Sequence, residues 1–432
     1  MLMMKWSLWK NLMNKDVKIV PVDKSNNFVG IRINEGKVEV CVPTVFRQDK
    51  NWKKDIRLFL KSIEIAKTQN KANIKKGSNE TDNIWPIDSY LWLINDYLEN
   101  GLYYNREKKL SRSNSGKIEW KKTLQQVPIY SDGNIIYDQL VTSRMVPAND
   151  MITHIYKMCL RQSVDKFGWL FNYNFQIQIV QIVSIKEMIM RVRKELNETF
   201  DDIKRIRFNH MLKILTTTEG DNMLSSHYTY GITNYYYVFE TMVDMLFDGI
   251  SGDEKKKYDP NGYWQLNGQN RFLASRLRPD TILKRKDKTY ILDAKMYQYG
   301  ATHDRSKLPE TQSLQKQITY GDFVSNNLMD ENIRKNIRNA FILPYNKCLK
   351  SFVNDHDAVK YNDSNLVYFG YGYVDWRDNE DFQDYDNIYA FGIDFNYLLN
   401  NYNKPDYEII NQFCEVIEEN IKRYREQNEI DN

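Results

Sequence analysis

Asp280 and the triplet Asp293-Ala294-Lys295 have residue types and a spacing that suit metal-dependent phosphodiester chemistry. They flank two short apolar runs, TILK (281–284) and TYILDAK (289–295), which predict antiparallel strands closed by a charged turn at 285–288. Pairing residue 284 with residue 289 would place Asp280 opposite Asp293, with Cβ atoms about 4.5–5.5 Å apart.

Two opposed carboxylates destabilise a hairpin unless a cation neutralises them. Because side chains alternate along a strand, Lys295 would share a face with Asp293. The triplet alone is also compatible with a solvated hairpin, since similar triplets occur at 16–18 and 202–204. The Pro-Asp step and the opposed register favour a site for a divalent cation.

Helices on either side of this hairpin could supply further groups. Within an expected helix at 233–248, Glu240 has Tyr236, Val243 and Phe247 as neighbours on its face. A buried carboxylate is costly without a partner, so Glu240 is a candidate third acid. Two alternatives stay open: Glu240 reaches water at the edge of the apolar face, or Asp244 takes its role.

An expected helix at 309–326 contains Lys316, Gln317 and Tyr320. Lys316 and Tyr320 lie four residues apart and share a face. Lys316 is therefore a candidate catalytic cation, and Gln317 a candidate DNA contact. An exposed polar face explains either residue equally well.

The segment 101–122 has seven basic and two acidic residues. Such a segment can neutralise phosphates, although a solvated loop is the more ordinary interpretation. Its candidate DNA-binding residues are Lys108, Lys109, Arg112, Lys117, Lys121 and Lys122.

The composition is that of a globular protein, with 42% hydrophobic and 27% charged residues in 432. No apolar run approaches the roughly 18–20 residues of a membrane span, so no membrane association and a cytoplasmic location are expected. The four cysteines lie far apart and predict buried reduced thiols. No phosphate-binding loop of the G-x-x-x-x-G-K-[ST] type occurs, so the chain alone should not hydrolyse nucleotides.

The order of elements predicts an α/β (α+β) fold with a mixed sheet flanked by helices. Strands are expected at 28–33, 37–42, 339–344, 366–374 and 387–395, and further helices at 52–68, 85–99 and 405–424. The expected domains are an N-terminal mixed α/β region (1–150) that binds DNA or a partner, a helical bridge (151–232) and a nuclease domain (233–432).

Glu240, RPD (278–280), LDAK (292–295) and the following helix resemble the PD-(D/E)xK nuclease fold. Two longer segments are similar to the LlaJI family of restriction endonucleases, namely SRLRPDTILKRKDKTYILDAKMYQYG (275–300) and LPETQSLQKQITYGDFV (308–324). A weaker similarity leads to the McrC nuclease subunits. Those carry Q-x-x-x-Y in the later helix, where this chain has Lys316 ahead of Tyr320.

The resemblance implies cleavage of double-stranded DNA at a specific sequence, together with a separate McrB-like GTPase subunit and a protective DNA methyltransferase. Asp280, Asp293 and the Ala294 carbonyl would hold Mg²⁺, a cation that prefers oxygen ligands, with Glu240 as a further ligand. Lys295 would orient the attacking water. The alternatives are a repair or recombination nuclease acting on DNA ends or structured DNA, and a non-catalytic DNA-binding or assembly protein.

Overall fold

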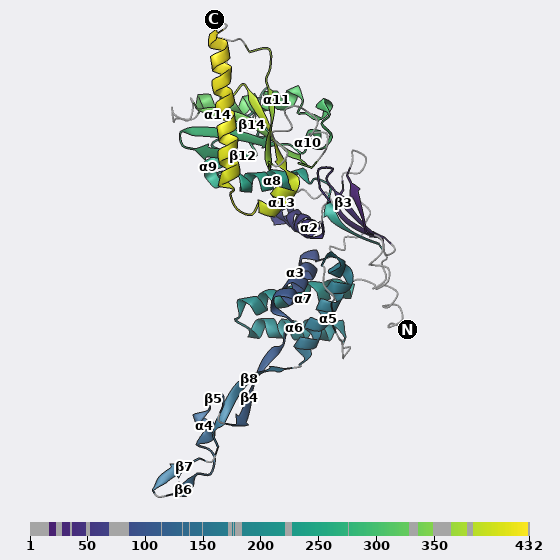
Figure 1. Ribbon diagram of the computed structural model, residues 1–432, viewed down its shortest axis with the longest axis vertical. Coiled ribbons are helices and arrows are strands. Elements are labelled where there is room, and N and C mark those ends of the chain that lie inside the picture. Colours follow the sequence, from purple (N-terminus) through teal and green to yellow (C-terminus); the bar gives the residue numbers. More distant parts are fainter. Residues whose placement is uncertain are drawn as a thin grey trace. The chain divides into compact units, whose positions relative to one another are not determined.

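The computed structural model is drawn in Figure 1. It describes residues 17–22, 28–34, 37–48, 52–68, 86–113, 115–131, 133–137, 139–148, 150–171, 175, 177, 184–220, 227–274, 276–327, 336–348, 364–377 and 383–430.

The chain divides into two compact units that do not follow the expected domains. One unit consists mainly of residues 78–228, and the other of residues 17–33, 38–77 and 229–432. The expected region 1–150 is therefore divided between the two units, and most of 151–232 belongs with its second half. The reason is strand pairing. The strand His227–Ile232, where the 78–228 segment ends, joins one sheet with three strands that lie between residues 17 and 42.

The larger unit contains a mixed sheet, which in the described residues has five strands in the order β12-β13-β14-β16-β15. Strands β12 and β13 are antiparallel, β13, β14 and β16 run parallel, and β15 is antiparallel to β16. The strand bounds are Thr281–Arg285 (β12), Lys288–Ala294 (β13), Ile337–Tyr345 (β14), Leu366–Gly372 (β15) and Ile388–Asp394 (β16). The expected mixed α/β class is thus confirmed.

Helices pack on both faces of this sheet. Ile291 packs with Tyr320 and Val324 of α11 (Thr311–Asn327), whereas the preceding Tyr290 contacts Phe413 of α14 (Tyr407–Ile430), with ring centroids 5.7 Å apart. Consecutive strand residues point to opposite faces, so α11 and α14 cover opposite sides. Further helices of this unit are α8 (Tyr236–Leu246), α9 (Gly252–Lys256), α10 (Tyr299–Thr302), η2 (Arg305–Lys307) and α13 (Phe395–Asn401).

A second sheet of the same unit joins the start of the chain to residues after 226, in the order β1-β3-β2-β9. Its strands are β1 (Val17–Pro21), β2 (Val29–Asn34), β3 (Lys37–Val42) and β9 (His227–Ile232). A Cβ atom on Gly30 would lie 2.0 Å from the carbonyl oxygen of Tyr230. Glycine is therefore required where β2 meets β9.

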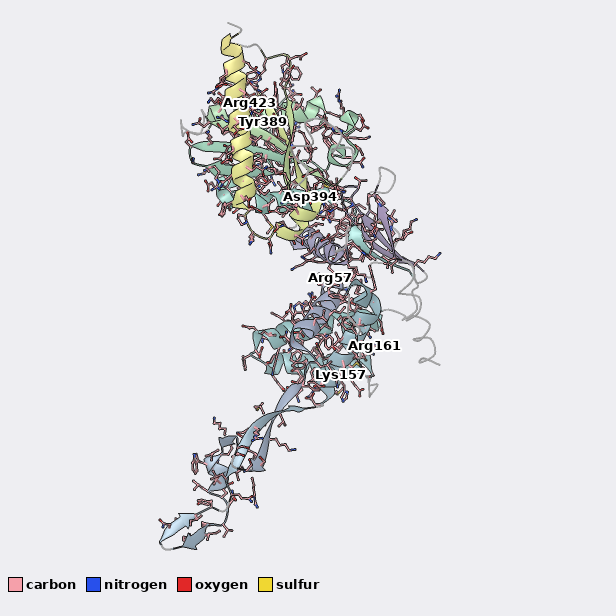
Figure 2. All side chains as sticks on the ribbon, in the orientation of Figure 1. Arg57, Lys157, Arg161, Tyr389, Asp394 and Arg423 are labelled. Carbon is pink, nitrogen blue, oxygen red and sulfur yellow. The ribbon has the colours of Figure 1, made fainter. Side chains whose placement is uncertain are left out.

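Polar contacts join the N-terminal segment, residues 17–77, to the end of strand β16 and to the residues that follow it. Arg47 lies 2.9 Å from the buried carboxylate of Asp394, which Figure 2 labels at the end of β16. Asn396 donates to Asp55 of α2 (Trp52–Thr68) over 2.8 Å. These pairs lie more than 340 residues apart in sequence, so the N-terminal segment is part of the same core.

The smaller unit is a helical bundle with a β arm. Its helices are α3 (Ile87–Asn100), α5 (Met151–Phe167), η1 (Gly168–Leu170), α6 (Ile185–Glu198) and α7 (Asp202–Gly220). Arg207 of α7 donates two 2.8 Å hydrogen bonds to the buried carboxylate of Asp96 in α3. Ser184 and Glu187 form a capping box at the start of α6.

The arm is an antiparallel ladder rather than a loop. It contains β4 (Asn105–Arg112), β5 (Lys117–Ile118), α4 (Trp120–Thr123), β6 (Ile129–Ser131), β7 (Asn134–Ile136) and β8 (Val141–Ala148). Asn105 donates to Asp150 and Thr153 at the start of α5, over 2.8 and 3.1 Å. Lys157, labelled in Figure 2, covers the Tyr104 ring at 5.2 Å and so fixes the base of the arm.

The four cysteines lie in the described residues and are free thiols. Cys41 and Cys159 are buried and Cys414 is partly buried, but Cys348 is exposed, so the expectation that all are buried is wrong for Cys348. Among the described helices, none is long and apolar enough to cross a membrane.

Candidate active site

The hairpin register agrees with the prediction. Lys284 pairs with Thr289 and Thr281 with Leu292. The ladder also includes Arg285 and Lys288, so the turn is shorter than expected and Lys286 adopts a left-handed conformation with φ 53°.

The paired ladder ends at Thr281, so Asp280, the residue before it in the sequence, lies just outside the paired residues. The Asp280 carboxylate accepts a 2.8 Å hydrogen bond from the backbone N–H of Ala294, the residue that follows Asp293. The end of the hairpin therefore brings the two aspartates together.

Asp293 is the most enclosed acid of the site, with 1% of its surface exposed. Lys295 approaches one of its carboxylate oxygens to 2.7 Å, and Lys316 of α11 approaches the other to 3.4 Å. An unpaired buried carboxylate is strongly disfavoured. The two ammonium groups compensate the charge of Asp293.

The electrostatics of Asp280 show that negative charge is concentrated here. Burial raises the pKa of Asp280 well above its usual value, and the nearby charges of Asp293 and Glu240 raise it further. The Ala294 N–H and Lys316 oppose this increase. A bound cation would favour the ionised form of Asp280.

Glu240 and Asp244 are distinguished by their surroundings. The charge of Glu240 acts on Asp280, and its side chain is only partly buried. Asp244 instead pairs with Lys255 at 3.1 Å. Of the two candidates for a third acid, the structure therefore associates Glu240 with the site and gives Asp244 a different partner.

The backbone before Asp280 is held by two side chains whose role the sequence did not indicate. Tyr320 of α11 donates a 2.8 Å hydrogen bond to the carbonyl of Arg278. Lys255 of α9 donates to the carbonyl of Asp280 while also binding Asp244. Burial raises the pKa of Tyr320, with Asp293 and Asp280 adding to the effect, so its hydroxyl stays protonated and remains a donor. Lys255 lies in a charged run, DEKKK, that gave no signal of this contact.

The expected contact between Gln317 and DNA is wrong in this structure. The Gln317 side chain is fully buried, and its amide donates a 2.7 Å hydrogen bond to the carbonyl of Ile291. Successive helix residues are about 100° apart around the axis. The Lys316 side chain therefore reaches Asp293, whereas the Gln317 side chain is directed to the backbone of β13.

The six basic residues proposed to contact DNA lie on the β arm of the other unit, and all are exposed. Lys108 forms an ion pair with Glu119. The candidate active site of the larger unit therefore contains none of the six, namely Lys108, Lys109, Arg112, Lys117, Lys121 and Lys122.

The donor set of the site suits a hard divalent cation. No group of three or more His, Cys, Asp and Glu side chains in the described residues could hold a metal ion. Mg²⁺ does not need such a group, because it is commonly bound through one or two carboxylates, waters and substrate phosphate oxygens. Asp280 and Asp293 meet that requirement, and Ala294, whose carbonyl is the expected further ligand, lies between Asp293 and Lys295 in the sequence.

Comparison of the sequence with models of known protein families shows a match to one family. The family model of the LlaJI restriction endonuclease matches residues 28–368. No sequence among the curated proteins matches significantly.

Two solved structures are similar in part. One is a half-complex from the tetradecameric assembly of Thermococcus gammatolerans McrB AAA+ hexamers with bound McrC, with 14% identity over 90% of this chain and 83% of the matched chain and a TM-score of 0.35. The other is the McrBC complex of the same organism, with 15% identity over 50% and 64% of the two chains and a TM-score of 0.21. These similarities are too low to transfer a function.

Proposed function

The chain belongs to the LlaJI restriction endonuclease family, and we propose that it is the subunit of a restriction system that hydrolyses phosphodiester bonds of double-stranded DNA with Mg²⁺. The family makes it a restriction-system nuclease. The observation that supports the site of cleavage is the enclosed Asp293, placed beside Asp280 and between Lys295 and Lys316.

In the proposed mechanism Asp280, Asp293 and the Ala294 carbonyl would hold the cation, and Glu240 would contribute through water. The chemistry supplied by Mg²⁺ when bound would be that of a Lewis acid, which lowers the pKa of a coordinated water. Lys295, anchored 2.7 Å from Asp293, orients the attacking water and offsets the charge that develops on the phosphate. Lys316 supplies a second positive charge from α11. Tyr320 and Lys255 keep the backbone of 278–280 in place.

The proposed partners are a McrB-like GTPase in a separate chain and a DNA methyltransferase that protects the host sequence. Support comes from the family and from the sequence, which has no G-x-x-x-x-G-K-[ST] loop of its own. Nucleotide hydrolysis in such a system would belong to another polypeptide. The cytoplasm, where DNA and nucleotide are available, is the proposed location.

The test is incubation of closed circular plasmid with the protein, Mg²⁺ and nucleotide, with and without the candidate GTPase, followed by mapping of the ends. Wild-type protein should linearise the circle, and Asp293→Ala should not. Asp253→Ala, which removes an exposed carboxylate paired with Lys256, is the matched control and should cleave normally.

A folded Asp293→Ala protein with full activity would refute the site. Degradation of linear DNA alone would favour a nuclease acting on ends. Absence of Mg²⁺ binding by calorimetry, together with absence of cleavage, would favour a non-catalytic protein.

A further inference from the structure

A two-stranded ribbon, made of residues 260–274 and 276–278, leads directly into the candidate active site. Its strands β10 (Tyr263–Trp264) and β11 (Phe272–Leu273) are antiparallel. Further hydrogen bonds continue the pairing toward the base, from Ala274 to Gly262 at 2.8 Å and from Leu277 to Pro260 at 3.3 Å. The second leg ends at Arg278, two residues before Asp280.

The base of the β10–β11 ribbon is fixed to the site. The Arg278 carbonyl accepts the hydrogen bond from Tyr320 of α11, and the Arg278 guanidinium lies 3.7 Å from the buried Asp259. The same helix α11 carries Lys316 to Asp293. A molecule that binds the ribbon is therefore brought close to the aspartates.

The ribbon exposes large flat side chains. Tyr263 is 50% exposed, Trp264 60% and Phe272 46%. A two-stranded ribbon has no core of its own and is marginally stable in water. Exposed aromatic groups on such an element mark a contact surface.

The ribbon is also positively charged. Arg271, Arg276 and Arg278 are exposed, and the sequence from 260 to 279 has no acidic residue. The Arg271 guanidinium stacks 3.6 Å from the centre of the Tyr263 ring. The turn between β10 and β11 has four exposed amide side chains, namely Gln265, Asn267, Gln269 and Asn270.

These features fit one kind of partner, double-stranded DNA. Arg278 already has Asp259 as an acidic neighbour, which leaves Arg271 and Arg276 as the arginines that complement phosphates. Amides and arginine pair with base edges, and the major groove admits a two-stranded β-ribbon. We infer that the β10–β11 ribbon binds duplex DNA and holds a phosphate against the Asp280–Asp293 site. This inference rests on the proposed nuclease function for its biological meaning, but its binding step can be measured separately.

The binding test uses the full chain carrying Asp293→Asn, so that the DNA stays intact, and a fluorescent duplex of about two helical turns. Arg271→Ala with Arg276→Ala should weaken binding and lower the slope of log affinity against log salt by about two, since each lost phosphate contact removes about one unit. Trp264→Ala should weaken binding with little change of slope. Circular dichroism should stay unchanged, because all three side chains are exposed.

Lys422→Ala with Arg423→Ala is the matched control. It removes the same charge from exposed positions of α14 in the same unit, where Figure 2 labels Arg423. The control should keep the wild-type affinity and slope. Equal losses in control and ribbon variants would overturn the inference, because binding would then depend on overall charge alone.

Cleavage assays separate this inference from the proposed function. Ribbon variants in the active background should cleave more slowly at limiting DNA. If wild-type protein cleaves and the ribbon variants bind and cleave as well as wild type, the ribbon inference fails and the nuclease stands. If no protein cleaves but the ribbon variants lose binding, the nuclease proposal fails and the ribbon inference stands. Loss of assembly with the GTPase, with unchanged DNA binding, would also refute the ribbon inference.

Discussion

At the scale of single residues, the site is a buried carboxylate compensated by two lysines of different origin. Lys295 follows Asp293 on the same strand face, and its ammonium is 2.7 Å away. Lys316 comes from α11, and its contact is longer at 3.4 Å. The shorter contact comes from within the hairpin itself, so Lys295 should matter more for the reaction than Lys316.

Replacement of the two lysines tests this order. Lys295→Ala should lower the rate of cleavage by roughly 10²–10³-fold, the usual cost of removing one group that stabilises developing charge. Lys316→Ala should lower it less, and Lys316→Gln least, because an amide still donates a hydrogen bond to Asp293. Single-turnover cleavage at saturating Mg²⁺ measures all three, with exposed Lys256→Ala as control. A Lys295→Ala protein as fast as wild type would contradict the assignment.

His210 gives a pH dependence in the helical unit. It contacts Ser89 at 3.0 Å and stacks on Trp92, and burial, assisted by Lys213, lowers its pKa to about 4. Between this value and the unfolded pKa of about 6.5, only the unfolded chain binds the proton. Stability is therefore present above pH 6.5 and is lost as the pH falls toward 4.

His210→Gln should consequently show a smaller decrease in Tm than wild type between pH 7.5 and 4.5. Titration of the His210 ring by NMR provides a direct measurement. A midpoint near 6.5 in the folded protein would show that burial does not exclude the proton.

At the scale of elements, the bundle depends on an ion pair between two helices. Asp96 of α3 and Arg207 of α7 are both buried and joined by two 2.8 Å hydrogen bonds. The Arg207 guanidinium also covers the ring of Tyr103 at 4.5 Å. Removing one partner leaves the other charge buried and unpaired, which is more costly than losing a surface pair.

Asp96→Ala should destabilise the bundle by about 3–5 kcal/mol. Lys194→Ala, which breaks an exposed pair of 3.9 Å with Glu198 in the same unit, should leave stability nearly unchanged. Urea unfolding followed by far-UV circular dichroism compares the two variants. A similar small effect for both would mean that Asp96 and Arg207 are solvated in solution.

At the scale of the whole molecule, one folded unit is assembled from two distant parts of the chain. Besides the contacts of Arg47 and Asn396, Ser62 of α2 shares a 2.7 Å hydrogen bond with Tyr235, next to α8. Phe59 packs on the Tyr235 ring with centroids 5.4 Å apart. The helix that presents Glu240 is therefore supported by residues from the N-terminal segment.

Residues 233–432 expressed alone should not reach the stability of the full chain, because the apolar surface that α2 covers would be exposed. Co-expression of residues 17–77 should restore a cooperative thermal transition. The comparison needs scanning calorimetry of the fragment, the fragment pair and the full protein. A fragment that unfolds cooperatively at the Tm of the intact unit would show that the N-terminal segment is dispensable.

The sequence by itself determined the elements that depend on local pattern. The helix at 52–68, the strands of the mixed sheet and the pairing of residue 284 with 289 follow from periodicity and a short turn. The association of Asp280, Asp293 and Lys295 follows from that pairing, because a hairpin register fixes which side chains share a face.

Only the tertiary structure decided what depends on contacts between distant segments. Lys255 contacts both the Asp244 carboxylate and the Asp280 carbonyl, and Gln317 is buried although its neighbour Lys316 reaches the site. Residues 17–33 and 38–77 belong to the same unit as the site. Local propensity does not encode which surfaces meet after chain segments pack together. The hairpin that brings the two aspartates and Lys295 together could therefore be predicted from the sequence, whereas the contacts that support it depend on packing across the whole fold.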